Sequence, residues 1–341
     1  MSTTSLSPVP PPHAVIMQIM MGKMLAAAVS ASARFSIADY LEHGPRTVAE
    51  LAKASGTLEQ PLYRVLRACA SAGIFEELPD GRFANTPLSE PLRTNATPCV
   101  RHIAMMFFAE WHQRGWTELP WVMQNGKSAV YKAYDSAPFE YLAQHPADAT
   151  LFNQAMMDLT TADAPVIASS YDFSQFKTLV DIGGGLGTLL GAILDRTPAL
   201  KGIVFDLPHV MDQIRQDRTL RKWLGRIDAV GGSFFDDVPP SDGYIMKHIL
   251  HDWDDESSKK ILMSCRKSIR PGGKVLVVDQ VVPPGNTPSM SKLMDLEMLV
   301  LPGGRERTEK EWDELFTASG LKLESIVSMP IPQSMLVGAP V

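Results

Sequence analysis

Residues 178–194 read TLVDIGGGLGTLLGAIL, and this stretch decides the fold. A short run with Val and Ile is followed by four glycines within five residues and then by a long apolar run. Glycine allows a tight turn and lets a ligand approach the backbone at the start of a helix. The stretch therefore predicts a strand, a ligand-binding loop and a helix. The third glycine of a dinucleotide-binding loop would fall at Thr188, so the glycines alone do not identify the ligand.

Beyond Phe176 the chain alternates runs typical of strands with runs typical of helices. The expected strands are TLVDIG, GIVFDL, RIDAVGGSFF, GYIMKHIL and KVLVVDQVV. Two of the expected helices run from Pro208 through Trp223 and over Glu256 to Ile269. Such alternation predicts an α/β fold, with helices covering both faces of a parallel sheet. In these sheets ligands bind beyond the carboxyl ends of the strands.

The composition is that of an ordinary globular chain long enough for two domains, with 341 residues, 45% of them hydrophobic, and a net charge of -6. Its charges are interspersed, so neither a nucleic acid nor a membrane is expected as a partner. Cys69, Cys99 and Cys265 lie far apart, which fits a reducing cytoplasmic location. Residues 1–12 are Pro-rich, lack the features of a secretory signal and are expected to be disordered.

An apolar helix is expected from Ala14 to Val29. It is interrupted by polar residues, and we expect it to be too short to span a bilayer. Four methionines recur at the spacing of one helical face: Met17, Met20, Met21 and Met24. This stripe predicts packing within the chain, with a methionine-rich dimer surface or a ligand wall as the alternative.

A winged helix is predicted within a domain that spans residues 13–99. Thr47 followed by Glu50 indicates the start of one helix, and a second helix is expected from Leu58 to Ala72. The sequence IFEELPDGRFANT then predicts two short strands joined by an Asp-Gly turn. Residues 1–95 contain eight basic and eight acidic side chains, which is a poor footprint for DNA phosphates. Dimerisation is therefore favoured over DNA binding.

The next segment, residues 100–170, is helical in pattern and rich in Trp, Phe and Met. Most of these side chains are expected in the core, but so many in one connecting segment also suit the wall of a cavity for a flat apolar ligand. We expect this connector to line the pocket of such a ligand, which would be the acceptor of the reaction, and residues 171–341 to form the catalytic domain.

Two aspartates end the first two expected strands of that domain. Asp181 precedes the glycines, where its carboxylate repels a pyrophosphate and attracts an ammonium or sulfonium group. Asp206 lies where a carboxylate accepts hydrogen bonds from the hydroxyls of a ribose, or else caps the helix near Pro208. A ribose with a positively charged amino-acid tail describes S-adenosylmethionine.

The stretch 246–255, MKHILHDWDD, concentrates a lysine, two histidines and three aspartates. A metal site is one interpretation, because hard cations bind carboxylates. A simpler interpretation makes Asp254 or Asp255 the N-cap of the following helix and His248 a core histidine. His248 and His251 are both candidates for a general base.

Six ordered motifs resemble the small-molecule O-methyltransferases of the plant caffeate, acetylserotonin and bacterial polyketide types: LVDIGGGLGT, FDLPHV, GGSFFDDVP, MKHILHDWDD, KSIRPGGKVLVVD and PGGRERTEKEW. The resemblance covers the whole chain and implies a Rossmann-like methyltransferase sheet, a winged-helix dimerisation domain and a homodimer. It implies that Lys247 holds the cofactor carboxylate and that His251 is the general base, with Asp279 and Glu306 as its acidic partners. A glutamate usually stands at the place of Asp279, and an aspartate at the place of Ser233.

Methyl transfer from a sulfonium to a phenol requires alignment and removal of a proton, which a neutral imidazole accomplishes without a metal. The expected cofactor-binding residues are Asp181, Gly183, Gly185, Asp206, Ser233, Phe234 and Lys247. The expected acceptor wall contains Trp111, Phe152, Met156 and Met298. The rival interpretations are an enzyme of the same fold that binds the cofactor without transferring its methyl group, a dehydrogenase and a winged-helix regulator.

Overall fold

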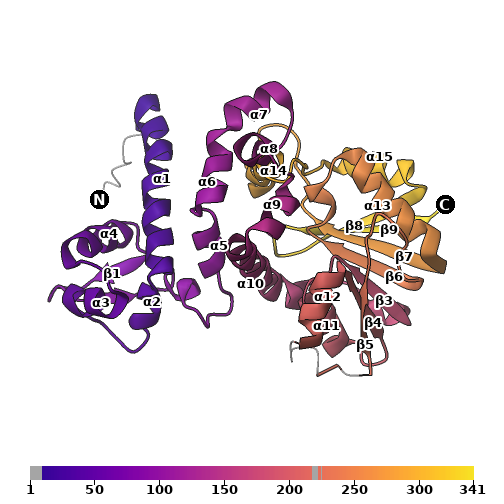
Figure 1. Ribbon diagram of the computed structural model, residues 1–341, viewed down its shortest axis with the longest axis horizontal. Helices are drawn as coiled ribbons and strands as arrows, with labels where there is room; N and C mark the ends of the chain where they lie inside the picture. The colour runs from indigo at the N-terminus through magenta and orange to yellow at the C-terminus, as the bar shows by residue number, and fades with distance from the viewer. Residues whose placement is uncertain (1–9, 217–221, 224) are drawn as a thin grey trace, which may run out of the picture. The chain divides into compact units, whose positions relative to one another are not determined.

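A computed structural model describes residues 10–216, 222–223 and 225–341 of the protein (Figure 1). Most of the expected disordered tail and the middle of the expected helix from Pro208 through Trp223 lie outside these described residues. The chain divides into two compact units, one ending at Ala109 and the other running from Glu110 to Val341. Each unit is described by itself. The four-segment division expected from the sequence stays a prediction.

The first unit contains the winged helix that the sequence predicts. Its elements are α1 (Pro12–Arg34), α2 (Ile37–Tyr40), α3 (Val48–Ser55), α4 (Glu59–Ser71), β1 (Phe75–Glu77), β2 (Phe83–Asn85), η1 (Glu90–Leu92) and α5 (Arg101–Met106). A reciprocal capping box of Thr47 and Glu50 starts α3, and Gly56 ends it in the left-handed conformation. β1 and β2 form an antiparallel hairpin, whose Phe75 and Phe83 are buried against α3 and α4.

The long helix α1 differs from its prediction in length and in packing. It continues to Arg34 and is the one helix in the described residues with the length and apolar composition of a membrane span. The expectation that it is too short is therefore wrong. Packing of the methionine stripe within the chain is also wrong, because Met17, Met20, Met21 and Met24 are between 55% and 70% exposed. The helix buries small residues near its carboxyl end instead: Ser30, Ser32 and Ala33.

The second unit is built on a seven-stranded sheet with the order β5-β4-β3-β6-β7-β9-β8. The five strands expected from the sequence are parallel: β3 (Thr178–Ile182), β4 (Lys201–Asp206), β5 (Ile227–Gly231), β6 (Ser241–Lys247) and β7 (Ile269–Asp279). The sheet is not wholly parallel, however. Two strands that we did not predict, β8 (Leu321–Ser328) and β9 (Ser334–Pro340), add an antiparallel edge next to β7.

Helices cover both faces of this sheet, as expected (Figure 1). One core joins the sheet to α10 (Pro146–Ser170), α11 (Thr188–Arg196) and α12 (Pro208–Gln216). The other core joins it to α13 (Asp255–Ser268) and α15 (Glu309–Ala318). The central strands β3, β6 and β7 are buried on both faces over most of their length, which explains their continuous apolar runs. The remaining helices of this unit are α6 (Glu110–Thr117), α7 (Leu119–Asn125), α8 (Ala129–Tyr134), α9 (Pro138–Gln144), α14 (Met290–Val300) and the short turns η2 (Phe173–Gln175) and η4 (Leu250–Asp252).

The parallel strands bring four of the predicted site residues to one edge of the sheet. Asp181, Asp206, Lys247 and Asp279 each stand at or next to the carboxyl end of a different strand. Because β4, β3, β6 and β7 are neighbours in that order, these four side chains follow one another along the edge. This edge is where ligands of open α/β sheets bind.

Candidate active site

The glycine loop connects β3 to α11 through backbone conformations that other residues rarely adopt. Gly183, Gly185 and Gly187 have φ angles of 66°, 54° and 76°. A Cβ atom on Gly183 would also lie 2.4 Å from the side chain of Ile249. The backbone therefore passes close to the segment that follows β6, and only glycine fits at this position.

A buried carboxyl group, Asp181, and a partly buried one, Asp206, flank the loop. Burial, and then the neighbouring Asp206, raises the pKa of Asp181 to about 7, and Asp181 Oδ2 has no hydrogen-bond partner. Asp206 accepts hydrogen bonds from the backbone nitrogens of Gly185, at 2.9 Å, and Leu207, at 2.7 Å. It thus fixes the glycine loop, a role that the sequence did not predict. A carboxylate has about four acceptor sites, so Asp206 retains capacity for ribose hydroxyls.

The remaining predicted cofactor residues lie along the same edge. Ser233 follows β5 and accepts a hydrogen bond from the backbone nitrogen of Phe235 at 3.2 Å. Phe234 packs edge-on against Phe235 and Trp253 and borders the glycine loop. An unpartnered buried carboxylate, a cradle without side chains and an aromatic ring fit a cofactor with a cationic tail, a ribose and an adenine.

Lys247 ends β6, and its ammonium group is nearly enclosed. The side chain is 5% exposed, and its Nζ lies 3.3 Å from Asp163 Oδ2 on α10. Burial lowers the pKa of this lysine, while the charge of Asp163 opposes that effect. The sequence did not single out Asp163, because one aspartate in a long helix carries no signal of its own.

His251 lies in η4, buried, with an acidic partner on one ring nitrogen. Its Nδ1 is 2.9 Å from Glu306 Oε1. Its Nε2 faces Asp252, whose Oδ1 is 3.6 Å away. Burial raises the pKa of Asp252 to about 7. The predicted base and the second of its predicted acidic partners are therefore in direct contact.

Glu306 lies in the loop after α14 and is held in place by that helix. Its backbone nitrogen donates a hydrogen bond to Asp295 Oδ1 at 2.9 Å. Burial, and then the charge of Asp295, raises the pKa of Glu306 to about 8. Its second oxygen, Oε2, is buried without a hydrogen-bond partner. Glu306 is therefore a buried carboxyl group and not a solvated charge of the loop.

Asp279 supports the base indirectly. Its Oδ1 accepts a hydrogen bond from the backbone nitrogen of His248 at 3.1 Å, and burial raises the pKa of Asp279 to about 7. In the described part of the chain, no hydrogen bond joins Asp279 to His251. The aspartate is one methylene shorter than the glutamate usual at this place, and it contacts the turn that leads to the base.

Arg307 clamps the loop that carries His251, which the sequence did not predict. Its side chain is fully buried and donates to the carbonyl oxygens of Leu250, at 3.1 Å, and Trp253, at 3.0 Å. It also pairs with Asp255 at 2.8 Å. As expected, Asp254 caps α13 by accepting a hydrogen bond from the backbone nitrogen of Ser257. Asp254 and Asp255 therefore have structural partners.

The predicted acceptor residues come from three helices of the second unit. Trp111 on α6 and Met298 on α14 are buried, whereas Phe152 and Met156 on α10 are partly exposed. α6 and α14 are tied together by Glu297, which contacts His112 Nε2 at 2.7 Å and Trp116 Nε1 at 2.8 Å. The indole nitrogen of Trp111 is buried without a hydrogen-bond partner, so it is available to a polar acceptor.

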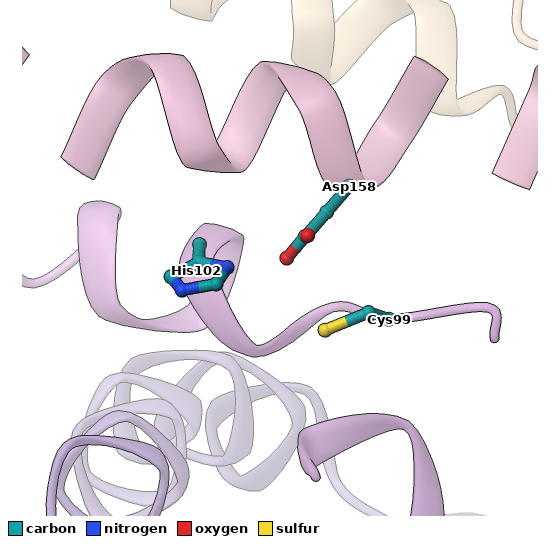
Figure 2. Close-up of side chains that lie close together, drawn as sticks. All are labelled: Cys99, His102 and Asp158. Carbon is teal, nitrogen blue, oxygen red and sulfur yellow. The ribbon is translucent and has the colours of Figure 1, made fainter. Parts of the chain in front are cut away.

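Three further polar side chains are drawn in Figure 2. Cys99 and His102 lie before and within α5, and Asp158 lies in α10. The first two belong to the unit that ends at Ala109 and the third belongs to the other unit. Because the three side chains belong to different units, no metal site is assigned to them.

The parallel sheet, the glycine loop after β3 and the charged side chains along the sheet edge are typical of an α/β methyltransferase. The O-methyltransferase domain model matches residues 116–322, and the O-methyltransferase dimerisation domain model matches residues 17–95. The chain belongs to this O-methyltransferase family. It is an S-adenosylmethionine-dependent O-methyltransferase that forms a homodimer.

Three relatives illustrate the range of the family. The phenazine O-methyltransferase PhzM of Lysobacter antibioticus is 39% identical, over 97% of each chain. The solved structure of CalO1, a methyltransferase in calicheamicin biosynthesis in its SAH-bound form, has a TM-score of 0.86 and is 35% identical, over 96% of this chain and 98% of that one. The 8-amino-8-demethylriboflavin N,N-dimethyltransferase of Streptomyces davaonensis is 30% identical, over 89% of this chain and 88% of that protein.

Proposed function

We propose that His251 is the general base for methylation of an aromatic or polyketide-like hydroxyl. The observation that carries the proposal is the 2.9 Å contact between His251 Nδ1 and Glu306 Oε1 inside a buried site. An ionised Glu306 accepts the Nδ1 proton, which leaves Nε2 unprotonated. A phenol has a pKa near that of tyrosine, about 10, so Nε2 removes its proton as the new bond forms.

The chain's own residues would hold the cofactor at the edge of the sheet. Bound S-adenosylmethionine supplies a methyl group that its sulfonium already activates. The backbone of the glycine loop, with Gly183 and Gly185, gives the cofactor room. Asp181, Asp206 and Lys247 offer partners for its ammonium, ribose and carboxylate, and Ser233 and Phe234 flank its adenine end.

The acceptor is proposed to be a flat hydroxylated aromatic held by Trp111, Phe152, Met156 and Met298. These side chains present aromatic and thioether surface, which suits a planar apolar ligand. The relatives agree, since two of the three are named for phenazine methylation and calicheamicin biosynthesis. A cytoplasmic location is part of this proposal, and it is supported by the wide separation of the three cysteines in the sequence.

Transfer to nitrogen is the second candidate, because one relative is named an N,N-dimethyltransferase. The two outcomes are separated by incubating the dimer with methyl-labelled S-adenosylmethionine and matched pairs of aromatic alcohols and amines. Mass spectrometry should find the label on hydroxyl groups. Labelling of amines alone would replace the proposal by N-methylation. Tight cofactor binding without label in any acceptor would contradict it.

A further inference from the structure

The residue that joins β6 to the base, His248, has a backbone conformation unusual for a side chain of its size. Its φ is 56°, in the left-handed region. The turn is held by two hydrogen bonds from its backbone nitrogen, to Val278 O at 3.2 Å and to Asp279 Oδ1 at 3.1 Å. Such conformations persist where surrounding contacts enforce them, and they gather at functional sites. The turn places the imidazole between Lys247 and His251.

The hydrogen-bond partners of His248 define where its proton lies. Nδ1 is 3.2 Å from Lys247 Nζ, and an ammonium only donates, so Nδ1 has to accept. The single proton of the neutral ring is then on Nε2, which is 2.8 Å from the side-chain amide of Gln333. The two ends of that amide have nearly the same shape. The amide atom at that distance is Gln333 Nε2, and a 180° turn of the amide exchanges it for Oε1, which has no hydrogen-bond partner in its present position and would then accept from His248 Nε2.

The same imidazole packs on the base. The rings of His248 and His251 are stacked, with centroids 5.0 Å apart and planes inclined by 17°. We propose that His248 is a positioning residue for methyl transfer. Its Nδ1 accepts a hydrogen bond from Lys247, its ring fixes the plane of the His251 ring, and Gln333 sets its tautomer. It thereby links the cofactor side of the site to the base.

The charges around His248 agree with a neutral ring. Burial, then the charge of Lys247 and the proximity of His251, lower the pKa of His248 well below its usual range. This makes His248 unsuitable as the rival base, since a base has to accept a proton. The inference rests on the proposed roles of Lys247 and His251, so its test needs a signal that does not depend on methyl transfer.

Two substitutions separate the two contacts of His248. His248→Asn keeps an acceptor as many bonds from Cα as Nδ1 and tolerates the left-handed backbone, but it removes the ring. His248→Phe keeps a flat ring and removes the acceptor. His43→Asn, at an exposed position of the first unit, is the matched control. The measurements are the Kd of S-adenosylhomocysteine by calorimetry, kcat at saturating cofactor, and the Tm of each variant.

We expect His248→Phe to raise the Kd about tenfold, since a lost hydrogen bond to a charged group costs at least that factor. We expect His248→Asn to leave the Kd nearly unchanged and to lower kcat about tenfold, because the base loses its alignment. If cofactor affinity and kcat fall equally in both variants, and in proportion to the fall in Tm, His248 has a purely structural role and the proposal is overturned. Unchanged Kd and kcat in both variants would overturn it as well.

Histidine nitrogen NMR of the cofactor-free dimer tests the tautomer directly. The signals of His248 are assigned by their loss in His248→Asn. A protonated Nε2 and an unprotonated Nδ1 at neutral pH are expected, and Gln333→Met should disturb this state. An imidazolium, or the opposite tautomer, would contradict the proposal. If His251→Ala leaves methyl transfer intact, the proposal that His251 is the general base is wrong. The Kd of S-adenosylhomocysteine and the tautomer of His248 still test the role of His248 separately.

Discussion

The contact between His251 and Glu306 makes the base dependent on the ionisation of its partner. Burial raises the pKa of Glu306 to about 8. Below that pH the pair of Glu306 and His251 holds one additional proton. Whether this proton is on the carboxyl group or on the ring, Nε2 of His251 is protonated and cannot accept another proton. The proton leaves as the pH rises, so activity should rise with pH.

We therefore expect kcat/KM to increase through a midpoint near pH 8. Glu306→Gln keeps an acceptor for Nδ1–H but cannot ionise. In this variant the rise of kcat/KM centred near pH 8 should be lost, because the carboxyl group that titrates there is absent. The check is a pH profile of kcat/KM for both proteins. An identical midpoint would show that Glu306 does not control the base.

Asp181 should make the stability of the cofactor-free protein depend on pH. Its folded-state pKa is raised to about 7 by burial, so the folded state binds the proton more tightly than the unfolded state. Stability is then full below the unfolded pKa of about 4 and is lost as the pH rises through 7. At pH 8, Asp181→Asn should raise the free energy of unfolding by at most about 4 kcal/mol. Denaturant titrations of both proteins at pH 5 and pH 8 measure this difference. We also expect Asp181→Asn to weaken the binding of S-adenosylhomocysteine.

Among individual residues of the site, the sequence predicted those that stand in a motif and missed those that do not. His251, Lys247 and Glu306 stand in motifs whose residue types indicate their chemistry. Asp163 and Gln333 contact Lys247 and His248 only through the fold. No local pattern marks such residues, because their partners are far away in the sequence.

Among the elements, the loop of residues 302–308 and the turn after β6 support each other. A Cβ on Gly304 would lie 2.0 Å from the carbonyl oxygen of His251, so the two backbones are in close contact. Arg305 N also donates to that oxygen at 2.9 Å. The orientation of the base therefore depends on a loop more than 50 residues away in the sequence.

Arg307 is expected to be the main support of this arrangement. Arg307→Met leaves buried carbonyl oxygens without donors and should lower the free energy of unfolding by about 3 to 5 kcal/mol. Arg305→Met is the matched control, because that side chain is 40% exposed. It should cost about 1 kcal/mol or less. If chemical denaturation shows that the two variants lose comparable free energies of unfolding, Arg307 is not the main support of this loop.

The helices and strands predicted best have both a regular hydrophobic pattern and a capping or turn residue at one end. The capping box of Thr47 and Glu50 and the strand before Gly183 are examples. β8 and β9 were missed because their antiparallel pairing at the edge of the sheet, next to β7, depends on the whole fold and not on LKLESIVS and SMLVGAP alone. The exposure of the methionine stripe was missed because periodicity identifies an apolar face but not what covers it.

For the whole molecule, the exposed stripe of α1 is expected to contribute to the homodimer. It lies within residues 17–95, the extent of the matched dimerisation domain. Met20→Glu combined with Met24→Glu should therefore shift the protein towards a monomer in analytical ultracentrifugation. Met123→Glu, at a residue of α7 that is 76% exposed, should leave the dimer intact. An unchanged dimer in the double variant would place the interface elsewhere.

The central claim is that His251 removes the acceptor's proton, and label transfer by His251→Ala tests it most directly. With saturating labelled S-adenosylmethionine and the best acceptor, the rate should fall at least about 100-fold. The Kd of S-adenosylhomocysteine should stay within about threefold of the unaltered protein, a change well under 1.4 kcal/mol. A variant that binds the cofactor and still transfers the label at the original rate would contradict the account.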